Sequence, residues 1–328
     1  MKFRTEIDLK PSLLKVGYDT PVMLTGSCFA EEIGKHFCNG KMKALINPFG
    51  VLYNPLSTLR SLELIMDAEK FTGDDLYHFD NKYLSFYHDT SFSSRDSSES
   101  LKKINRSLAD ANRFLSGASF LFISFGTAWV YRWKEDNRVV ANCHKIPAAR
   151  FTRQLLKPED IISGWLSLIE KLENFNTRLN IVFTVSPVRH LKDGAHGNQL
   201  SKSTLLLAID RLMSLNNKLS YFPSYEIMLD ELRDYRFYGK DMVHPSETAV
   251  DYLWEKFKEY YFTDHTRTIY ERLLKITEAT KHIITGNDSE DNAKFSKTML
   301  GKIGSLLRDY PGIDLTEEEK YFKNLLKK

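Results

Sequence analysis

The sequence has few cysteines and no apolar run long enough to cross a membrane. Its 328 residues include three cysteines. That is too few for a secreted disulfide scaffold and indicates a reducing compartment. The longest apolar stretch, residues 118–130, is interrupted by polar residues and is shorter than the roughly 20 residues of a transmembrane helix. The charged first residues lack the apolar segment of a signal peptide. These absences predict a cytoplasmic protein without membrane contact.

An excess of one charge is also absent. The chain carries 46 Lys and Arg against 43 Asp and Glu, whereas a nucleic-acid-binding domain usually has a marked basic excess. No glycine-rich phosphate motif for a dinucleotide or nucleoside triphosphate occurs. No cysteine or carboxylate cluster has ligand spacing around the histidines. We therefore expect no nucleic acid partner, no metal and no cofactor.

Short apolar runs alternate with longer amphipathic segments, a pattern typical of a parallel sheet with crossover helices. An apolar fraction of 42% is enough to build a core. The expected strands are Val22–Thr25, Lys43–Ile46, Phe120–Phe125, Ile181–Val185 and Leu219–Phe222. The expected helices are Cys28–Phe37, Leu56–Asp67, Glu99–Leu115, Pro158–Lys171, Ser201–Asn217 and Ser246–Tyr261. The pattern predicts an α/β domain with a five-stranded parallel sheet.

We place a domain boundary near residue 265. Residues 1–265 would form the α/β domain, with a surface excursion at about 71–100 that is either a flap over a site or a solvated connector. Residues 266–328 would form a C-terminal helical extension. Its apolar stripes need a partner, either the α/β body or a second subunit in a homo-oligomer.

The most informative stretch runs from Val22 to Gly34, where a strand leads through Gly26 and Ser27 directly into a helix. In open α/β sheets, ligands bind at this carboxyl edge. The Ser27 hydroxyl would lie beside free N–H groups and the positive end of the helix dipole, which favour a developing oxyanion. Ser27 is therefore either a nucleophile or only a helix cap, a role in which serine is common.

Asp241 and His244 lie three residues apart, before Pro245. A carboxylate at this spacing can accept from His Nδ1–H and leave Nε2 as a proton acceptor. Alone, the pair is better explained as a capping Asp and a surface His. The chain order Ser, Asp, His is that of triads built on α/β sheets, which favours a catalytic set of Ser27, Asp241 and His244.

The chain resembles the GSCFA family, whose name is spelled by Gly26-Ser27-Cys28-Phe29-Ala30. Further blocks similar to the family are residues 47–55, 125–131, 185–190 and 241–245. The resemblance covers roughly residues 20–260. It implies a branch of the SGNH (GDSL-like) hydrolases, which are three-layer α/β/α esterases and acyl hydrolases with a serine nucleophile and a D-x-x-H loop.

The resemblance also implies an oxyanion hole, the group of donors that stabilises negative charge on the substrate oxygen. Its donors would be the backbone N–H groups of Ser27 and Gly50, although Gly50 is also consistent with a plain turn glycine. The asparagine that usually follows the third strand is missing, because the chain has Gly126-Thr127-Ala128-Trp129 there. Either this donor is lost, or it is replaced by the Thr127 hydroxyl, a backbone N–H or the Asn47 side chain.

Two functions follow from this sequence. The first is a serine esterase or acyl hydrolase, or an acyltransferase using the same residues, acting on a small-molecule or carbohydrate ester. Trp129 and Tyr53 would stack on a sugar, and Arg189 and His190 are further candidates for substrate binding, although Arg189 is also consistent with a structural ion pair. The second is a non-catalytic binding or scaffold protein that keeps the fold, which the missing asparagine favours.

Overall fold

The computed structural model describes residues 5–281 and 289–326 of the chain. A parallel sheet of five strands forms its centre, in the order β10-β9-β5-β1-β2. The strands are β1 (Val22–Gly26), β2 (Ala44–Ile46), β5 (Phe120–Phe125), β9 (Asn180–Val185) and β10 (Leu219–Tyr221). This confirms the predicted five-stranded parallel sheet, with each strand within one residue of its expected bounds.

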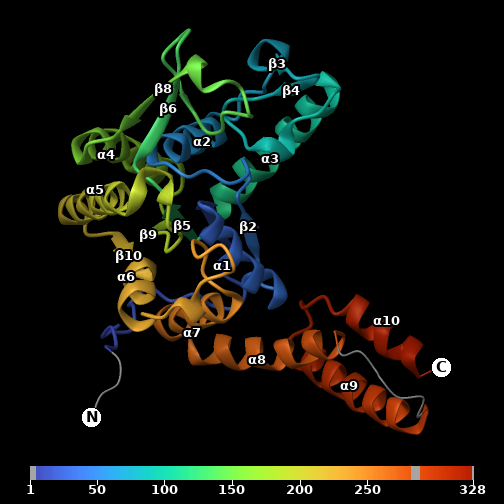
Figure 1. The fold of residues 1–328 in the computed structure, drawn as a ribbon. Helices are drawn as coiled ribbons and strands as arrows, with labels where there is room; N and C mark the ends of the chain where they lie inside the picture. The colour runs from blue at the N-terminus through green and yellow to red at the C-terminus, as the bar shows by residue number, and fades with distance from the viewer. Residues whose placement is uncertain (1–4, 282–288, 327–328) are drawn as a thin grey trace.

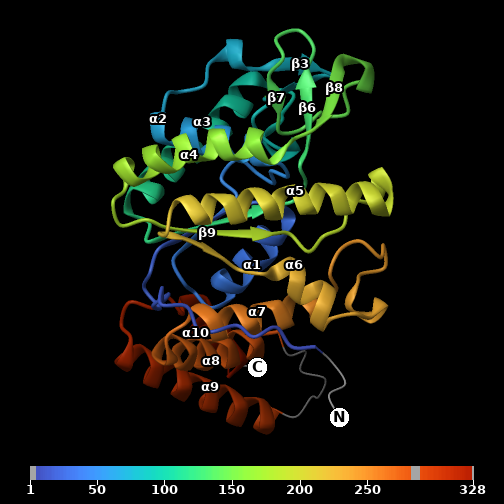
Figure 2. The same cartoon turned by 90° about the vertical axis from the view of Figure 1, so that its left-hand side faces the viewer.

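Both faces of the sheet are covered by helices, because successive side chains of a strand point to opposite faces. Leu24, Phe122 and Val182 pack with α1 (Cys28–Asn39) and α7 (Glu247–Tyr261). The neighbouring residues Met23 and Ile123 pack on the other side. The helices of that side are α2 (Pro55–Asp67), α3 (Ser97–Gly117), α4 (Pro158–Phe175) and α5 (Gly194–Leu215). Figure 2 shows α4 and α5 on one side of β9 and α1 and α7 on the other.

A small antiparallel lobe, which the sequence reading did not predict, lies at one end of the molecule (Figure 1). Its sheet has the order β7-β6-β8. Its elements are β6 (Trp129–Trp133), β7 (Val139–Val140), β8 (Phe151–Leu155) and the hairpin β3 (Tyr77–Phe79) to β4 (Lys82–Leu84). Phe86, Trp133 and Phe151 build its core. The segment predicted as a surface excursion, 71–100, thus contributes a hairpin to an ordered lobe.

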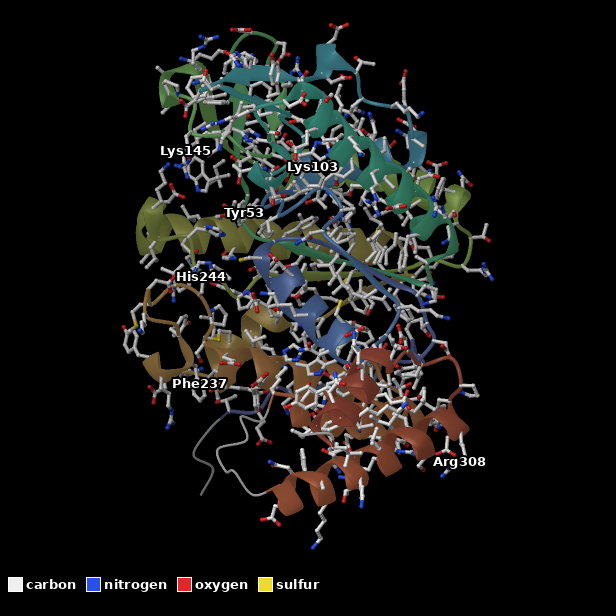
Figure 3. The ribbon with its side chains drawn as sticks, turned by 90° about the vertical axis from the view of Figure 1, so that its right-hand side faces the viewer. Tyr53, Lys103, Lys145, Phe237, His244 and Arg308 are labelled. Carbon is white, nitrogen blue, oxygen red and sulfur yellow. The ribbon has the colours of Figure 1, made fainter. Side chains whose placement is uncertain are left out.

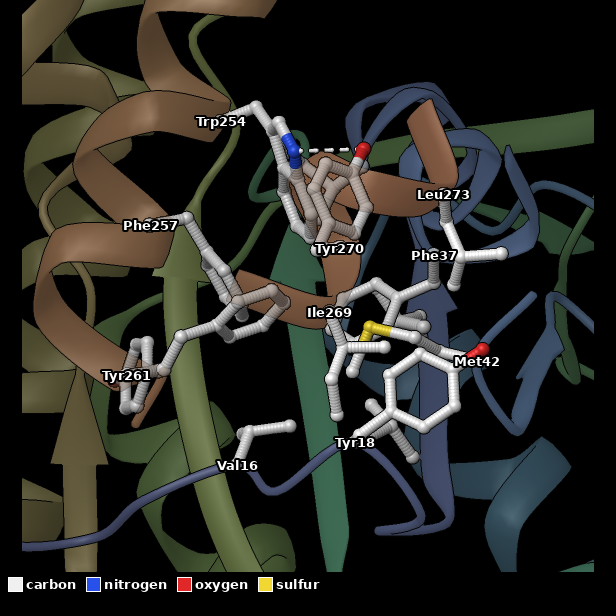
Figure 4. Close-up of a cluster of buried hydrophobic side chains, with 14 of the residues drawn as sticks. Val16, Tyr18, Phe37, Met42, Trp254, Phe257, Tyr261, Ile269, Tyr270 and Leu273 are labelled. Carbon is white, nitrogen blue, oxygen red and sulfur yellow. Dashed lines mark hydrogen bonds between the residues drawn. The ribbon is translucent and has the colours of Figure 1, made fainter. Parts of the chain in front are cut away.

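The predicted helical extension follows the α/β body and, in the described ranges, contains three helices: α8 (Asp264–Ala279), α9 (Ser289–Asp309) and α10 (Thr316–Leu325). They share one core with α1 and α7. Tyr270 of α8 joins them, because its hydroxyl accepts from Trp254 Nε1 at 3.0 Å and donates to the carbonyl of His36 at 3.2 Å. Figure 4 shows the bond between Trp254 and Tyr270 within the cluster. The extension therefore packs on the body.

A short helix, α6 (Ser224–Glu226), follows β10 and leads toward the loop that carries Asp241 and His244. No helix within the described ranges has the length and hydropathy needed to cross a bilayer.

The shared core predicts a large effect at Tyr270. Tyr270→Ala should lower the free energy of unfolding by about 3–5 kcal/mol, as for other buried aromatic residues. Tyr270→Phe should lower it by about 1–3 kcal/mol, because the indole N–H of Trp254 loses its acceptor. Urea denaturation of the full chain measures both. A loss below about 1 kcal/mol for the alanine variant would contradict a core shared between the helical extension and the body.

Candidate active site

The end of β1 fixes the position of Ser27. Gly26 has a φ of 120°, and a β-carbon there would lie 2.2 Å from the Ser124 carbonyl oxygen on β5. Only glycine therefore fits between the two strands. Ser27 follows in extended conformation as the N-cap of α1, with its Oγ 3.3 Å from the N–H of Phe29. This is the strand-to-helix position at the carboxyl edge that the sequence predicted.

Ser27 is held by Ser124 in this structure. Its backbone N–H donates to the Ser124 carbonyl at 2.9 Å, and the two hydroxyl oxygens are 2.7 Å apart. The residue is 1% exposed. Within the described residues, no hydrogen bond joins Ser27 to His244. The Ser27 hydroxyl thus contacts the Ser124 hydroxyl on β5 and the backbone N–H of Phe29 at the start of α1.

Asp241 and His244 are brought together on one loop, as the D-x-x-H spacing predicted. Asp241 Oδ2 lies 2.6 Å from His244 Nδ1, and Asp241 Oδ1 accepts from the N–H groups of Val243 and His244 at 3.0 Å each. The backbone bonds from His244 and Val243, followed by the ring bond, hold the pKa of Asp241 well below its usual range. Asp241 is therefore an anion that orients the imidazole and leaves Nε2 available.

The His244 loop is anchored next to the end of β9. The N–H of Arg189 donates to the carbonyl of Val243 at 3.2 Å. His244 lies between two cavities, one lined by Cys28 and Phe29 beside Ser27 and another lined by Tyr53 and His190. Figure 3 shows Tyr53 and His244 on the same side of the molecule. Solvent therefore reaches His244 close to the edge where Ser27 lies.

His190 lies close to the candidate nucleophile. Its Nε2 and the β-carbon of Ser27 are each 3.4 Å from the place that a β-carbon on Gly126 would occupy. Its N–H donates to Asn198 Oδ1, but within the described residues nothing hydrogen-bonds to its ring nitrogens. Burial, with the charges of Lys202 and His244, lowers the pKa of His190 to about 4. The ring is therefore neutral at physiological pH and carries one N–H.

The predicted oxyanion donors are mostly engaged. The N–H of Gly50 donates to the Asn47 carbonyl at 2.7 Å, and Gly50 has a φ of 77° with the Asp89 carboxylate packed where a β-carbon would be. These contacts are those of a turn glycine. The N–H of Thr127 donates to the Tyr53 carbonyl at 2.9 Å, and its hydroxyl lies 3.0 Å from Ser201 Oγ. The buried carboxamide of Asn47 has no partner in the described part of the chain.

The predicted substrate residues lie together. Trp129, Tyr53, Arg189 and His190 all line one cavity of about 380 Å³ beside His244. Tyr53 and His190 meet edge to face with ring centroids 5.8 Å apart. The lobe built on β6 supplies one wall, and the ends of the main sheet supply the other. The carboxyl edge of the sheet thus borders a cleft that holds aromatic, basic and imidazole groups.

The family model of the GSCFA family matches residues 21–257 of the chain, which is more than two thirds of its length. The chain belongs to the GSCFA family. Ser27, Asp241 and His244 all lie inside the matched range, whereas α8, α9 and α10 lie beyond it. The family match therefore covers most of the α/β body and none of the helical extension.

Other comparisons add little about this GSCFA chain. A solved structure of an acetyl xylan esterase (Est2A) from the rumen bacterium Butyrivibrio proteoclasticus is similar at 12% identity, with a TM-score of 0.33. The match covers 75% of this chain and 66% of that one, just under two thirds. Such a weak likeness carries no argument about fold or function. No curated protein matches the chain.

Sequence reasoning missed Lys202, which bonds to the backbone at the ends of two strands of the main sheet. It is fully buried on α5, and its Nζ donates to the carbonyls of Gly126 and Ser186 at 2.7 Å each. These carbonyls lie directly after β5 and β9. In the residues that the structure describes, no carboxylate forms an ion pair with it. Burial, together with the charge of Arg189, lowers the pKa of Lys202 to about 7.

A signal for Lys202 exists in the sequence. Asn198, Ser201, Lys202 and Leu205 have helical spacing i, i+3, i+4 and i+7, and all four are buried on α5. Three polar residues thus occupy the start of an apolar stripe. Asn198 accepts from the N–H of His190, and Ser201 Oγ accepts from the N–H of Ala128 at 2.8 Å. The sequence signal for Lys202 was therefore its place among polar residues on an otherwise apolar face of α5.

Lys202 should make stability depend on pH. Because the folded protein binds this proton less tightly than the unfolded chain, the free energy of unfolding should rise with pH from about 7 to about 10. Lys202→Met should remove that rise, so the difference between wild type and variant changes by up to about 1.4 kcal/mol per pH unit. Urea denaturation across this range measures it. Parallel curves for the two proteins would show that Lys202 keeps its proton throughout.

Proposed function

We propose that this protein is a serine esterase or acyl hydrolase that forms an acyl-enzyme on Ser27. One observation carries the proposal: Asp241 orients His244 through a 2.6 Å bond, on a loop tied to the sheet edge where Ser27 caps α1. A carboxylate, an imidazole with a free Nε2 and a serine at a helix N-terminus are the groups that acyl transfer uses. Membership of the GSCFA family agrees with this reading.

The proposed reaction begins when the Ser27 side chain turns from Ser124 toward His244. His244 Nε2 takes the hydroxyl proton as Ser27 Oγ attacks the ester carbonyl. The ring then returns the proton to the departing alcohol, and Asp241 stabilises the imidazolium in between. In the second step His244 Nε2 takes a proton from water as the water attacks the acyl carbon, and it returns that proton to Ser27 Oγ as the bond between Ser27 and the acyl group breaks. An alcohol in place of water would give acyl transfer with the same residues.

We assign the oxyanion hole to His190 and Asn47. His190 Nε2 and the β-carbon of Ser27 flank the same point next to Gly126, and a neutral imidazole N–H can donate to a developing oxyanion. Asn47 offers a buried carboxamide whose N–H groups lack acceptors among the described residues. Both groups are needed in this proposal because the N–H groups of Ser27 and Gly50 already donate to carbonyls. We favour acylated carbohydrates as substrates because the rings of Trp129 and Tyr53, which line the cleft, can stack on a sugar.

A non-catalytic binding protein is the second candidate. The observation that favours it is the resting state of Ser27, which is buried and hydrogen-bonded to Ser124 rather than to His244. A binding protein would use the same cleft and need no turnover. The cytoplasmic location and a homo-oligomer remain predictions from the sequence.

The triad proposal predicts strong non-additivity. Ser27→Ala and His244→Ala should each lower kcat on a short aryl ester by about 10⁴-fold or more, and the double variant should be little worse. Steady-state kinetics of the three variants measures this. Losses that multiply in the double variant would mean that the two residues act independently. Full activity of Ser27→Ala would rule out a Ser27 acyl-enzyme.

The oxyanion assignment predicts a separate loss at His190. His190→Ala should lower kcat by about 10²–10³-fold with a small change in KM, because the donor acts on charge that exists only in the transition state. His190→Gln keeps an N–H and should recover part of the loss. Kinetics at constant pH, with melting curves as a folding control, measures the effect. A change confined to KM would instead make His190 a substrate-binding residue.

A further inference from the structure

The cleft beside His244 carries more positive than negative charge. Its charged lining consists of Arg153, Arg189 and Lys192 against a single carboxylate, Asp193, apart from the His190 and His244 rings. The whole chain has a net charge of only +3. Positive charge is therefore concentrated in this cleft of about 380 Å³.

The one carboxylate of the cleft is already neutralised. Asp193 lies 2.5 Å from the guanidinium of Arg153, and its side chain is only 8% exposed. The same guanidinium lies over the Trp129 ring at 3.9 Å from the ring centroid. Arg153 and Asp193 thus form a pair that holds Trp129 in place, and Asp193 is not free for a second cation.

Arg189 and Lys192 keep their charges uncompensated. Among the described residues, no carboxylate lies within ion-pair distance of either side chain. Lys192 Nζ donates to the Tyr131 hydroxyl at 3.0 Å, which leaves its charge in place. Arg189 is half-buried and its backbone is bonded to the His244 loop. The structural ion pair that the sequence left open for Arg189 is therefore absent from the described residues.

We infer that Arg189, assisted by Lys192, binds an anionic group of the substrate, so that the preferred ester carries a carboxylate or a phosphate. The guanidinium fork matches both groups with two parallel bonds. A half-buried cation without a partner is costly until an anion reaches it, and this one lies on the loop that neighbours His244. The inference rests on the proposed esterase function and adds the charge that its substrate carries.

Two pairs of esters, each with one anionic and one neutral member, test whether the site prefers an anionic substrate. One pair is para-acetoxybenzoate and its methyl ester, with the anion on the alcohol side. The other is para-nitrophenyl hydrogen glutarate and para-nitrophenyl pentanoate, with the anion on the acyl side. In at least one pair, wild type should prefer the anion, and Arg189→Gln should lower the ratio of kcat/KM values by about 10-fold or more. Arg211→Gln removes an exposed cation of α5 outside the cleft and should leave the ratio unchanged.

A binding measurement separates this inference from the esterase proposal. Glutarate and inorganic phosphate should raise the melting temperature of Ser27→Ala, and less so that of Ser27→Ala with Arg189→Gln. That result without ester hydrolysis by wild type would keep the anion site and overturn the esterase. Hydrolysis of both esters of each pair without preference, and an unchanged ratio in Arg189→Gln, would overturn the anion site and keep the esterase.

Discussion

The position of Ser27 depends on the contact between Gly26 and Ser124. The two backbones approach so closely that a β-carbon on Gly26 would lie 2.2 Å from the Ser124 carbonyl. The same carbonyl accepts from the N–H of Ser27, and the Ser124 hydroxyl meets that of Ser27. A single residue of β5 thus fixes the backbone, the amide and the side chain of the candidate nucleophile. The start of α1 and its dipole are oriented by the same contact.

Helix α5 positions other segments of the sheet edge near Ser27. Its buried polar stripe reaches each neighbouring segment: Asn198 holds His190, Ser201 holds Ala128, and Lys202 holds the ends of β5 and β9. Placing such groups in the core is costly unless their bonds are made. The bonds that these side chains form hold the segments at this edge in position, which limits displacements of the candidate catalytic groups.

The sequence predicted the sheet well because buried parallel strands are continuous apolar runs, such as Phe120–Phe125. The Asp241–His244 bond was also predictable, since a spacing of three on one loop favours it. The lobe was missed because β6 reads Trp-Val-Tyr-Arg-Trp, with only Val130 and Trp133 buried. Lys202 was missed because a lone lysine looks like a solvated residue until its helical neighbours are counted. The state of Ser27 depends on Ser124, a tertiary contact that no local pattern reveals.

A candidate nucleophile, an imidazole oriented by a carboxylate and a basic cleft lie at one edge of the GSCFA domain. The central claim is that Ser27 carries the acyl group. Rapid acid quench of the protein with para-nitrophenyl acetate, followed by peptide mass spectrometry, tests this most directly. The account predicts an acetyl group on the peptide that contains Ser27 and none on that peptide in His244→Ala. Release of nitrophenol by wild type without acetylated Ser27, or acetylation that persists in His244→Ala, would contradict it.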